Sequence, residues 1–471
     1  MKKYVSEITS KDKDFAKWYT DLCVKAELMS YGDVKGFIIY RPYGFSLWEN
    51  IKNYLNNELK KTNHSNVYFP MLIPENLFQK EKDHVDGFNP EAAVVSSVGD
   101  NKLNERYIIR PTSETLFCTY FSKIIQSHRD LPKKYNQWCS VVRWEKTTRP
   151  FLRGKEFLWQ EGHTVHENSI EAKKEALDVL DIYKKMGENL LAIPFLTGLK
   201  TQKEKFAGAL ETYSLEALMP DGQALQSGTT HYFGQEFSKA FDITYTDKNN
   251  DVKFVHQTSW GVSSRLIGAL IMVHGDDNGL VMPPNVAPIQ IRIIQISNKP
   301  EVIQEVNNIY SDLKNEFRVD IDESDKSPGW KFSEQEMKGI PLRIEIGPKD
   351  VENKTVNIVK RYNGEKIKTK ISEIKREISN ILEDIHLGML KKAKKFVKEN
   401  TKKCNNYDEF KMHIKSGGYI EMSIHPDAEE IIKKETTATA RIIPFDQPKN
   451  FGICPVTNKK AEFKVLFARA Y

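Results

Sequence analysis

The sequence lacks the features that identify membrane proteins, secreted proteins and P-loop nucleotide-binding proteins. No stretch approaches the ~20 consecutive apolar residues that span a bilayer, so we expect no membrane segment. The chain begins Met-Lys-Lys without an apolar core after it, which argues against a secretory signal. The motif GxxxxGK(S/T) is absent, which excludes a P-loop nucleotide site, and no GxGxxG follows a predicted strand.

Paired cysteines are also missing. The five cysteines are an odd number, are scattered and form no CxxC pair; they are Cys23, Cys118, Cys139, Cys404 and Cys454. This usage is typical of reduced thiols in a reducing compartment. We therefore expect a cytoplasmic protein.

A structural zinc site is not expected. Such a site needs four Cys or His ligands in closely spaced pairs. The C-terminal region offers only isolated residues of these types: Cys404, His413, His425 and Cys454. In the segment CPVT, Thr457 stands where a CxxC pair would have its second cysteine.

The charge is mildly positive and unevenly distributed. The formal net charge is +6, from 70 basic and 64 acidic side chains. Residues 349–403 hold 16 Lys and Arg against 8 Asp and Glu. Such a segment either attracts the phosphates of a nucleic acid or is a solvated, lysine-rich helix. Charge alone leaves both interpretations open.

A chain of 471 residues is too long for one ordinary domain. Residues 1–285 are mixed α and β, and the proline-rich run at 280–290 is a plausible linker. Alternating strand and helix patterns then predict an α/β domain with a trailing helix over 286–400. Residues 401–471 are expected to form a small α+β domain.

Periodicity predicts several elements. Ser46 and Glu49 form a possible capping box for a helix over 46–61. Residues 66–73 favour a strand interrupted by Pro70, and 169–191 favours an amphipathic helix. Further along, the pattern predicts helices over 301–317 and 372–398 and a strand over 355–360.

The segment Val141–His163, VVRWEKTTRPFLRGKEFLWQEGH, carries the strongest chemical signal. Arg143 and Glu145 alternate on a predicted extended run, so their side chains should share one face. Arginine grips phosphate bidentately, and Phe157, four residues after Arg153, could stack on a base. Taken alone, the segment could also be a surface strand with ordinary ion pairs.

Three other segments accompany it in a fixed order. They are RPTSET at 110–115, ALQSGTTHYFGQEF at 224–237 and QTSWGVSSRLIG at 257–268, the last of which contains Arg265. Small residues in the third segment allow a ligand to approach the backbone. Each piece alone could be a turn or strand end, but the four together resemble a class II aminoacyl-tRNA synthetase.

The resemblance is specific within that class. Pro70 matches the first, dimer-forming motif, Arg143 to Phe157 the second, and Gly261 to Arg265 the third. The pieces RPTSE, EFLWQEGH and SWG are similar to prolyl-tRNA synthetases of archaeal/eukaryotic-type architecture. This resemblance implies an α/β multi-domain protein with an antiparallel catalytic sheet flanked by helices, an α/β anticodon-binding domain and a C-terminal domain with a degenerate zinc site.

The resemblance also implies roles for individual residues. Catalysis would depend on Arg143, Glu145 and Arg265. ATP would be bound by Arg143, Glu145, Arg153, Gly154, Phe157, Gln226, Thr229, Ser263 and Arg265, with Mg²⁺ near Gln226. Proline would be bound by Thr112, Glu114, Arg143, Trp159, Glu161, His163, Phe206, His231, Ser259 and Gly261. Gly154 departs from the family pattern, since many relatives carry threonine there.

The implied partners are L-proline, tRNA(Pro) and a second copy of the chain in a homodimer. Glu345 and Arg361 are the candidates for reading anticodon bases. The gap between Phe157 and Trp260 is too short for a large editing insertion, so we expect no built-in removal of mischarged alanine. Two other hypotheses stay open: another class II specificity, or a non-catalytic RNA-binding regulator.

Overall fold

The computed structural model describes residues 8–84 and 91–471. The first expected domain begins at Met1, so its residues 1–7 lie outside the described part. Within these ranges, no helix has both the length and the apolar character needed to cross a bilayer.

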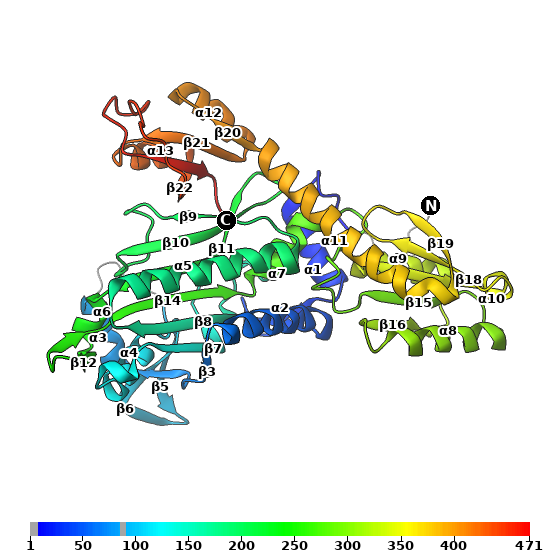
Figure 1. Cartoon of the computed structure of the whole chain (residues 1–471), viewed down its shortest axis with the longest axis horizontal. Coiled ribbons are helices and arrows are strands. Elements are labelled where there is room, and N and C mark those ends of the chain that lie inside the picture. Colours follow the sequence, from blue (N-terminus) through cyan, green and yellow to red (C-terminus); the bar gives the residue numbers. More distant parts are fainter. Residues whose placement is uncertain (1–7, 85–90) are drawn as a thin grey trace.

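The centre of the molecule is one large sheet (Figure 1), with eleven strands among the described residues. In spatial order they are β20 (Thr401–Lys403), β21 (Tyr419–Ile424), β23 (Phe463–Ala468), β22 (Thr439–Pro444), β9 (Leu196–Leu199), β10 (Glu211–Leu218), β11 (Ala224–Gly234), β14 (His256–Ser263), β8 (Glu156–His166), β7 (Lys133–Val142) and β3 (Ser65–Val67). The pairs β20–β21 and β3–β7 are parallel. The other pairs are antiparallel, as expected for this fold class.

Helix α5 (Ser169–Met186) covers one face of this sheet (Figure 1). Asn168 caps it by accepting a hydrogen bond from the backbone N–H of Glu171, at 3.0 Å. Tyr183 on its inner face donates to Gln160 Oε1 on β8 at 2.6 Å. The helix passes into a π turn, η2 (Gly187–Leu191), rather than running as one α-helix over 169–191.

Two local predictions were wrong in detail. Helix α2 (Pro42–Lys61) begins four residues before Ser46, because Pro42 occupies the first helical turn, where its missing N–H costs nothing. The expected strand over 66–73 is two strands in different sheets, β3 and β4 (Leu72–Pro74), and Pro70 lies in the connection between them. A proline cannot donate to a ladder, so it separates the two pairings.

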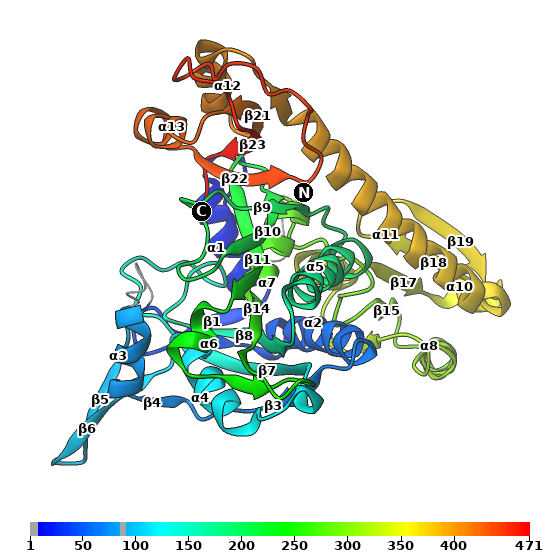
Figure 2. The same ribbon diagram turned by 60° about the vertical axis from the view of Figure 1, so that its left-hand side comes forward.

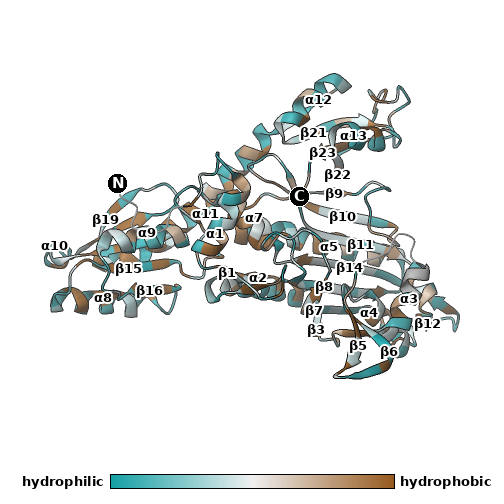
Figure 3. Cartoon of the chain, turned by 180° about the vertical axis from the view of Figure 1, so that it is seen from behind, coloured by the Kyte–Doolittle hydropathy of each residue, from teal (hydrophilic) through white to brown (hydrophobic). Residues whose placement is uncertain are grey.

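Smaller elements surround the central sheet. They are α1 (Phe15–Lys25), β1 (Met29–Tyr31), β2 (Ile38–Tyr40), α3 (Glu75–His84), β5 (Val94–Val98), β6 (Asn101–Ile109), α4 (Glu114–Ile124), η1 (His128–Asp130), α6 (Glu236–Ala240), β12 (Thr244–Thr246), β13 (Val252–Phe254) and α7 (Arg265–His274). Strands β5 and β6 project from the body (Figure 2). Helix α7 is apolar and lies in the middle of the molecule, where it is coloured hydrophobic (Figure 3).

After the proline-rich connection, the chain forms a second, five-stranded sheet. Its order is β16 (Val319–Asp322), β15 (Ile291–Gln295), β17 (Leu342–Ile346), β18 (Thr355–Lys360) and β19 (Lys366–Lys370). The helices of this region are α8 (Pro300–Leu313), α9 (Pro328–Lys338), α10 (Pro348–Glu352), η3 (Ile371–Glu373) and α11 (Ile374–Glu399). Its apolar core is separate from that of the central sheet.

The long helix α11 leads from this second sheet to the C-terminal region (Figures 1 and 2). That region adds α12 (Tyr407–Ser416) and α13 (Ala428–Thr436) around its own apolar core. Its strands continue the central sheet, because β22 pairs with β9 through Ile443 and Leu199. The tail is therefore joined to the body by backbone hydrogen bonds, which its sequence pattern did not indicate.

Candidate functional site

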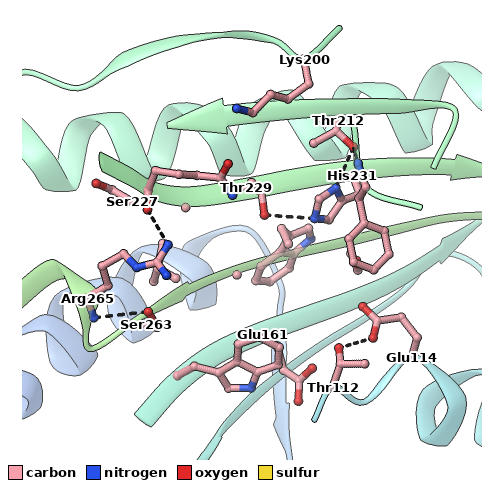
Figure 4. Close-up of a pocket in the computed structure, with 18 of the residues that line it drawn as sticks. Thr112, Glu114, Glu161, Lys200, Thr212, Ser227, Thr229, His231, Ser263 and Arg265 are labelled. Atoms are coloured by element: carbon pink, nitrogen blue, oxygen red, sulfur yellow. Dashed lines mark hydrogen bonds between the residues drawn. The ribbon is translucent and has the colours of Figure 1, made fainter. Parts of the chain in front are cut away.

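A cavity of about 310 Å³ opens on the face of the central sheet opposite α5 (Figure 4). Strand alternation selects the residues that line it. On β8, Phe157, Trp159, Glu161 and His163 face the cavity, whereas Gln160 contacts Tyr183 of α5. Alternate side chains of β8 therefore point to opposite faces of the sheet: one set lines the cavity and the other packs against α5.

Most of the residues expected to bind ligands meet in this cavity. Its lining includes Thr112, Glu114, Arg143, Phe157, Trp159, Glu161, His163, Phe206, Gln226, Thr229, His231, Ser259, Gly261, Ser263 and Arg265. These residues come from β8, β11, β14, the start of α4, the start of α7 and the connecting loops.

Arg143 is held at one wall of the cavity. Its Nε donates to the carbonyl of Pro111 at 3.0 Å, and its guanidinium lies over the rings of Phe157 and Trp159, 5.6 and 5.3 Å from their centroids. Burial lowers its pKa, and the nearby carboxylates oppose that shift. The planar group is therefore fixed in orientation before any ligand arrives.

Arg265 lies at the start of α7. Its Nε donates to the carbonyl of Leu152 at 3.1 Å, and its Nη1 donates to the carbonyl of Gln226 at 3.0 Å. Burial, followed by the positive charges of Arg143 and Arg153, lowers its pKa to about 10. Positive charge is thus concentrated where an anion would bind.

The remaining ATP candidates line two adjoining cavities. One of these cavities is lined by Arg143, Glu145 and Arg153. The other is lined by Arg153, Gly154 and Phe157. A Cβ on Gly154 would lie 2.8 Å from the carbonyl oxygen of Glu156, so this turn is built for glycine.

The prediction that Arg143 and Glu145 share one strand face was wrong. Strand β7 ends at Val142, and both residues lie in the loop that follows. The backbone N–H of Glu145 donates to the carbonyl of Arg143 at 2.7 Å, which bends the chain there. As a result Glu145 lines the adjoining cavity and not the main one.

A buried hydrogen-bond network holds Glu161 in the main cavity. Its Oε1 accepts from Ser113 Oγ at 2.5 Å and Gln137 Nε2 at 2.8 Å, and its Oε2 lies 3.1 Å from His163 Nε2. Burial raises the pKa of Glu161, but the interactions with His163 and the hydrogen bonds from Ser113 and Gln137 together outweigh burial, and the pKa is lowered. Nearby, Thr112 Oγ1 donates to the carboxylate of Glu114.

His231 is held neutral on β11. Its two ring nitrogens lie 3.0 Å from the hydroxyls of Thr212 and Thr229, and its ring is 4.7 Å from that of Phe206. Burial, followed by the neighbouring His163, lowers its pKa to about 3. A neutral imidazole beside an aromatic ring suits a compact, largely apolar ligand.

Glu345 and Arg361 lie far from this cavity, in the second sheet region. Arg361 Nη1 and Nη2 donate to the two oxygens of Asp276 at 2.9 and 2.6 Å, and its Nε donates to the carbonyl of Glu336 at 3.0 Å. Its side chain is 6% exposed, so it joins two regions and does not face solvent. Glu345 accepts from Arg343 Nε at 2.8 Å. This pairing counts against the prediction that Arg361 reads an anticodon base.

Sequence reasoning missed several lining or supporting residues, namely Ser113, Gln137, Lys200, Thr212 and Ser227. Ser113 and Ser227 lie within the segments 110–115 and 224–237, which the sequence had already marked. The remaining residues carry no local signal, since strand pairing brings them to the cavity.

Metal ligands are few in the described part of the chain. One group of three, Cys404, Glu409 and His413, has ligand atoms within 4.8 Å of one another. This is one ligand short of a structural zinc site, and Lys402 Nζ lies 3.1 Å from His413 Nδ1. The group does not fit a closed zinc centre. In the main cavity, the side-chain amide of Gln226 offers an oxygen of the type that Mg²⁺ binds.

Three family models match the chain in order. Residues 96–274 match the tRNA synthetase class II core domain (G, H, P, S and T), and residues 290–381 match an anticodon binding domain. Residues 407–471 match the prolyl-tRNA synthetase C-terminal domain. With the antiparallel sheet and its arginine-lined cavity, these matches define a class II aminoacyl-tRNA synthetase.

Similar proteins narrow the assignment. The chain is 56% identical to the proline–tRNA ligase of Onion yellows phytoplasma (strain OY-M) over 471 residues, which covers 100% of this chain and 99% of that one. It is 53% identical to the proline–tRNA ligase of Clostridium novyi (strain NT), with the same coverage of both chains. A crystal structure of prolyl-tRNA synthetase from Cryptosporidium parvum, complexed with halofuginone and AMPPNP, matches with a TM-score of 0.95 at 40% identity, covering 99% of both chains.

The chain belongs to the prolyl-tRNA synthetase family. Its activity is that of a proline–tRNA ligase, which uses ATP to join proline to tRNA.

Proposed function

We propose that the main cavity is the site where ATP activates proline to prolyl-adenylate. The supporting observation is that Arg143 and Arg265 meet Glu114, Trp159 and His231 in one cavity of about 310 Å³. Proline-dependent exchange of pyrophosphate into ATP tests this directly. Exchange with a different amino acid, and none with proline, would contradict the specificity.

Proline fits the side of the cavity that carries Glu114 and the aromatic rings. The secondary ammonium would bind Glu114, with Thr112 orienting that carboxylate. The ring would lie among Trp159, Phe206 and the neutral His231, which all line the cavity. The other proposed proline contacts are Arg143, Glu161, His163, Ser259 and Gly261.

ATP fits the arginine side. Arg143 would bridge the proline carboxylate and the α-phosphate, while Arg153 and Arg265 would hold the outer phosphates. Glu145 would bind the adenine amino group, and Phe157 would stack on the ring. Gly154, Gln226, Thr229 and Ser263 complete the proposed ATP contacts.

The chemistry needs no protein nucleophile. Attack of the proline carboxylate on the α-phosphorus places negative charge on phosphate oxygens as pyrophosphate leaves. Fixed guanidinium groups stabilise that charge because they are already oriented before the reaction. Mg²⁺, which Gln226 would help to hold, supplies further neutralisation of the phosphates. The terminal ribose hydroxyl of tRNA would then attack the adenylate.

For the whole chain we propose three domains: catalytic (1–285), anticodon-binding (286–400) and C-terminal (401–471). Separate apolar cores support the division. We also propose the archaeal/eukaryotic-type architecture, since residues 157–260 are occupied by β8 to β14 with no added domain among them. Glu345 remains the proposed base-reading residue, whereas the Asp276 pairing counts against Arg361.

We further propose a cytoplasmic homodimer. Exposed apolar side chains near Pro70 and on the projecting strands support a self-contact; they are Tyr68, Met71, Leu72, Val94 and Val98. Light scattering during gel filtration tests the mass. We propose that the C-terminal domain packs without zinc, and metal analysis of the purified protein tests this.

A further inference from the structure

Lys200 is a buried cation in the main cavity that the proposed roles leave unused. It follows β9, and its backbone N–H donates to the carbonyl of Thr212 at 2.7 Å. Its side chain is 2% exposed and lines the cavity. In Figure 4 it lies on the side of Ser227 and Thr229, across the cavity from Thr112 and Glu114.

The carboxylate of Glu216, on β10, holds this lysine. Glu216 is fully buried, and its Oε1 accepts from Lys200 Nζ at 3.1 Å and from Ser214 Oγ at 2.7 Å. Burial lowers the pKa of Lys200, while the charge of Glu216 opposes that shift. A lysine kept in such a place needs charge partners to remain protonated.

The second cation on Glu216 comes from the C-terminal domain. Arg441, on β22, donates from Nη2 to both carboxylate oxygens, at 2.9 and 3.1 Å, and from Nε to Oε2 at 3.1 Å. Its Nη1 donates to Thr439 Oγ1 at 3.0 Å. The cluster of Lys200, Glu216 and Arg441 thus buries two positive charges around one negative charge.

The cluster adjoins the arginine side of the cavity. Glu216 pairs in register with Gln226 on β11, and the carbonyl of Gln226 accepts from Arg265 at 3.0 Å. An ammonium has three donors, and Glu216 Oε1 is the acceptor described for Lys200. The excess positive charge and these donors are suited to an anionic oxygen in the cavity.

We propose that Lys200 contacts a phosphate oxygen of ATP, and that Arg441 is a positioning residue that acts on Lys200 through Glu216. The C-terminal domain then contributes to ATP binding without touching the nucleotide. This inference rests on the proposed ATP site and adds one contact residue and one positioning residue to it.

The first test is Lys200→Met, which keeps the side chain's length and removes its charge. In pyrophosphate exchange we expect the KM for ATP to rise about 10- to 100-fold, the effect of losing one hydrogen bond to a charged group, with the KM for proline unchanged. Lys203→Ala is the matched control, since Lys203 lies on the same loop but pairs with Glu430, at 3.4 Å, outside the cavity. A parental KM for ATP, or a rise in the KM for proline alone, would overturn the proposal.

The second test concerns Arg441. Arg441→Ala should raise the KM for ATP about 3- to 10-fold, and Arg441→Lys should recover part of it, because a cation again faces Glu216. In the Lys200→Met background, Arg441→Ala should change the KM for ATP no further. An equal effect in both backgrounds would mean that Arg441 does not act through Lys200. If Arg441→Ala is insoluble, Arg441→Lys in the two backgrounds makes the same comparison.

A third variant separates this inference from the proposed function. Arg265→Ala should raise the KM for ATP if the ATP site is correct. If the parent shows no proline-dependent exchange, or Arg265→Ala has no effect, the proposed function fails. If both behave as expected and Lys200→Met keeps the parental KM for ATP, only this inference fails.

Discussion

The main cavity and the seam where Arg361 meets Asp276 both contain buried arginines, but the arginines have different partners. At the seam, Arg361 binds the carboxylate of Asp276 through two nitrogens. In the cavity, Arg143 and Arg265 donate to backbone carbonyls, which orient the groups without neutralising them. A charge that is paired inside the protein joins two regions, whereas an oriented charge without an ion pair remains available to a ligand.

The largest effect should come from the cavity. Arg143→Ala should lower the rate of proline-dependent pyrophosphate exchange by at least ~100-fold, because it removes preorganised positive charge from the reacting phosphate. Arg361→Ala is the matched control and should exchange at close to the parental rate. Near-normal exchange by Arg143→Ala would refute its assigned role.

The next effect is a loss of stability in acid, which both regions should share. Burial lowers the pKa of His231 in the cavity to about 3 and of His274 at the seam to about 4. Since these values lie below the ordinary value near 6.5, the unfolded chain binds more protons than the folded chain as the pH falls. Stability is therefore full above about pH 6.5 and is lost as the pH falls towards 4, by at most roughly 3 kcal/mol for His274.

The variant His274→Gln isolates the contribution of the seam. Urea unfolding of the parent and the variant between pH 7 and pH 4 should show a smaller loss of stability in the variant. Identical pH profiles would mean that the pKa of His274 is the same in the folded and unfolded chain, which would contradict the prediction.

A smaller effect is expected from the ion pair at the seam. Arg361→Ala should lower the free energy of unfolding by about 1 to 2 kcal/mol, a modest value because Asp276 keeps contact with solvent. A double-mutant cycle with Asp276→Ala measures the coupling. Additive single effects would show that the pair contributes nothing as a pair.

The smallest effect should come from an exposed pair. Lys174 and Asp178 lie one turn apart on α5, with side chains 71% and 47% exposed. Lys174→Ala should leave the midpoint of thermal unfolding within error, because solvent screens such pairs. A shift as large as that of Arg361→Ala would contradict the distinction between buried and exposed pairs.

The sequence predicted the strand at 355–360 and the α/β alternation of the second domain because apolar periodicity is a local signal. Through its family resemblance the sequence also placed Trp159, Glu161 and His163 in one pocket, and the structure shows all three on β8 and lining the cavity. The sequence pattern misplaced Glu145, because a backbone turn after Val142 breaks the alternation of side chains. It could not reveal that Arg361 is buried, since Asp276 lies 85 residues away in the chain.

The sequence by itself determined the family, the order of the domains and most of the residues that line the cavity, because these are carried by short segments with recognisable chemistry. Only the tertiary structure decided which charges are neutralised and which remain available. Lys200, Glu216 and Arg441 come from three separate strand regions, and nothing local marks them as partners. Their contact depends on the pairing of β22 with β9, a long-range event that joins the end of the chain to its catalytic sheet.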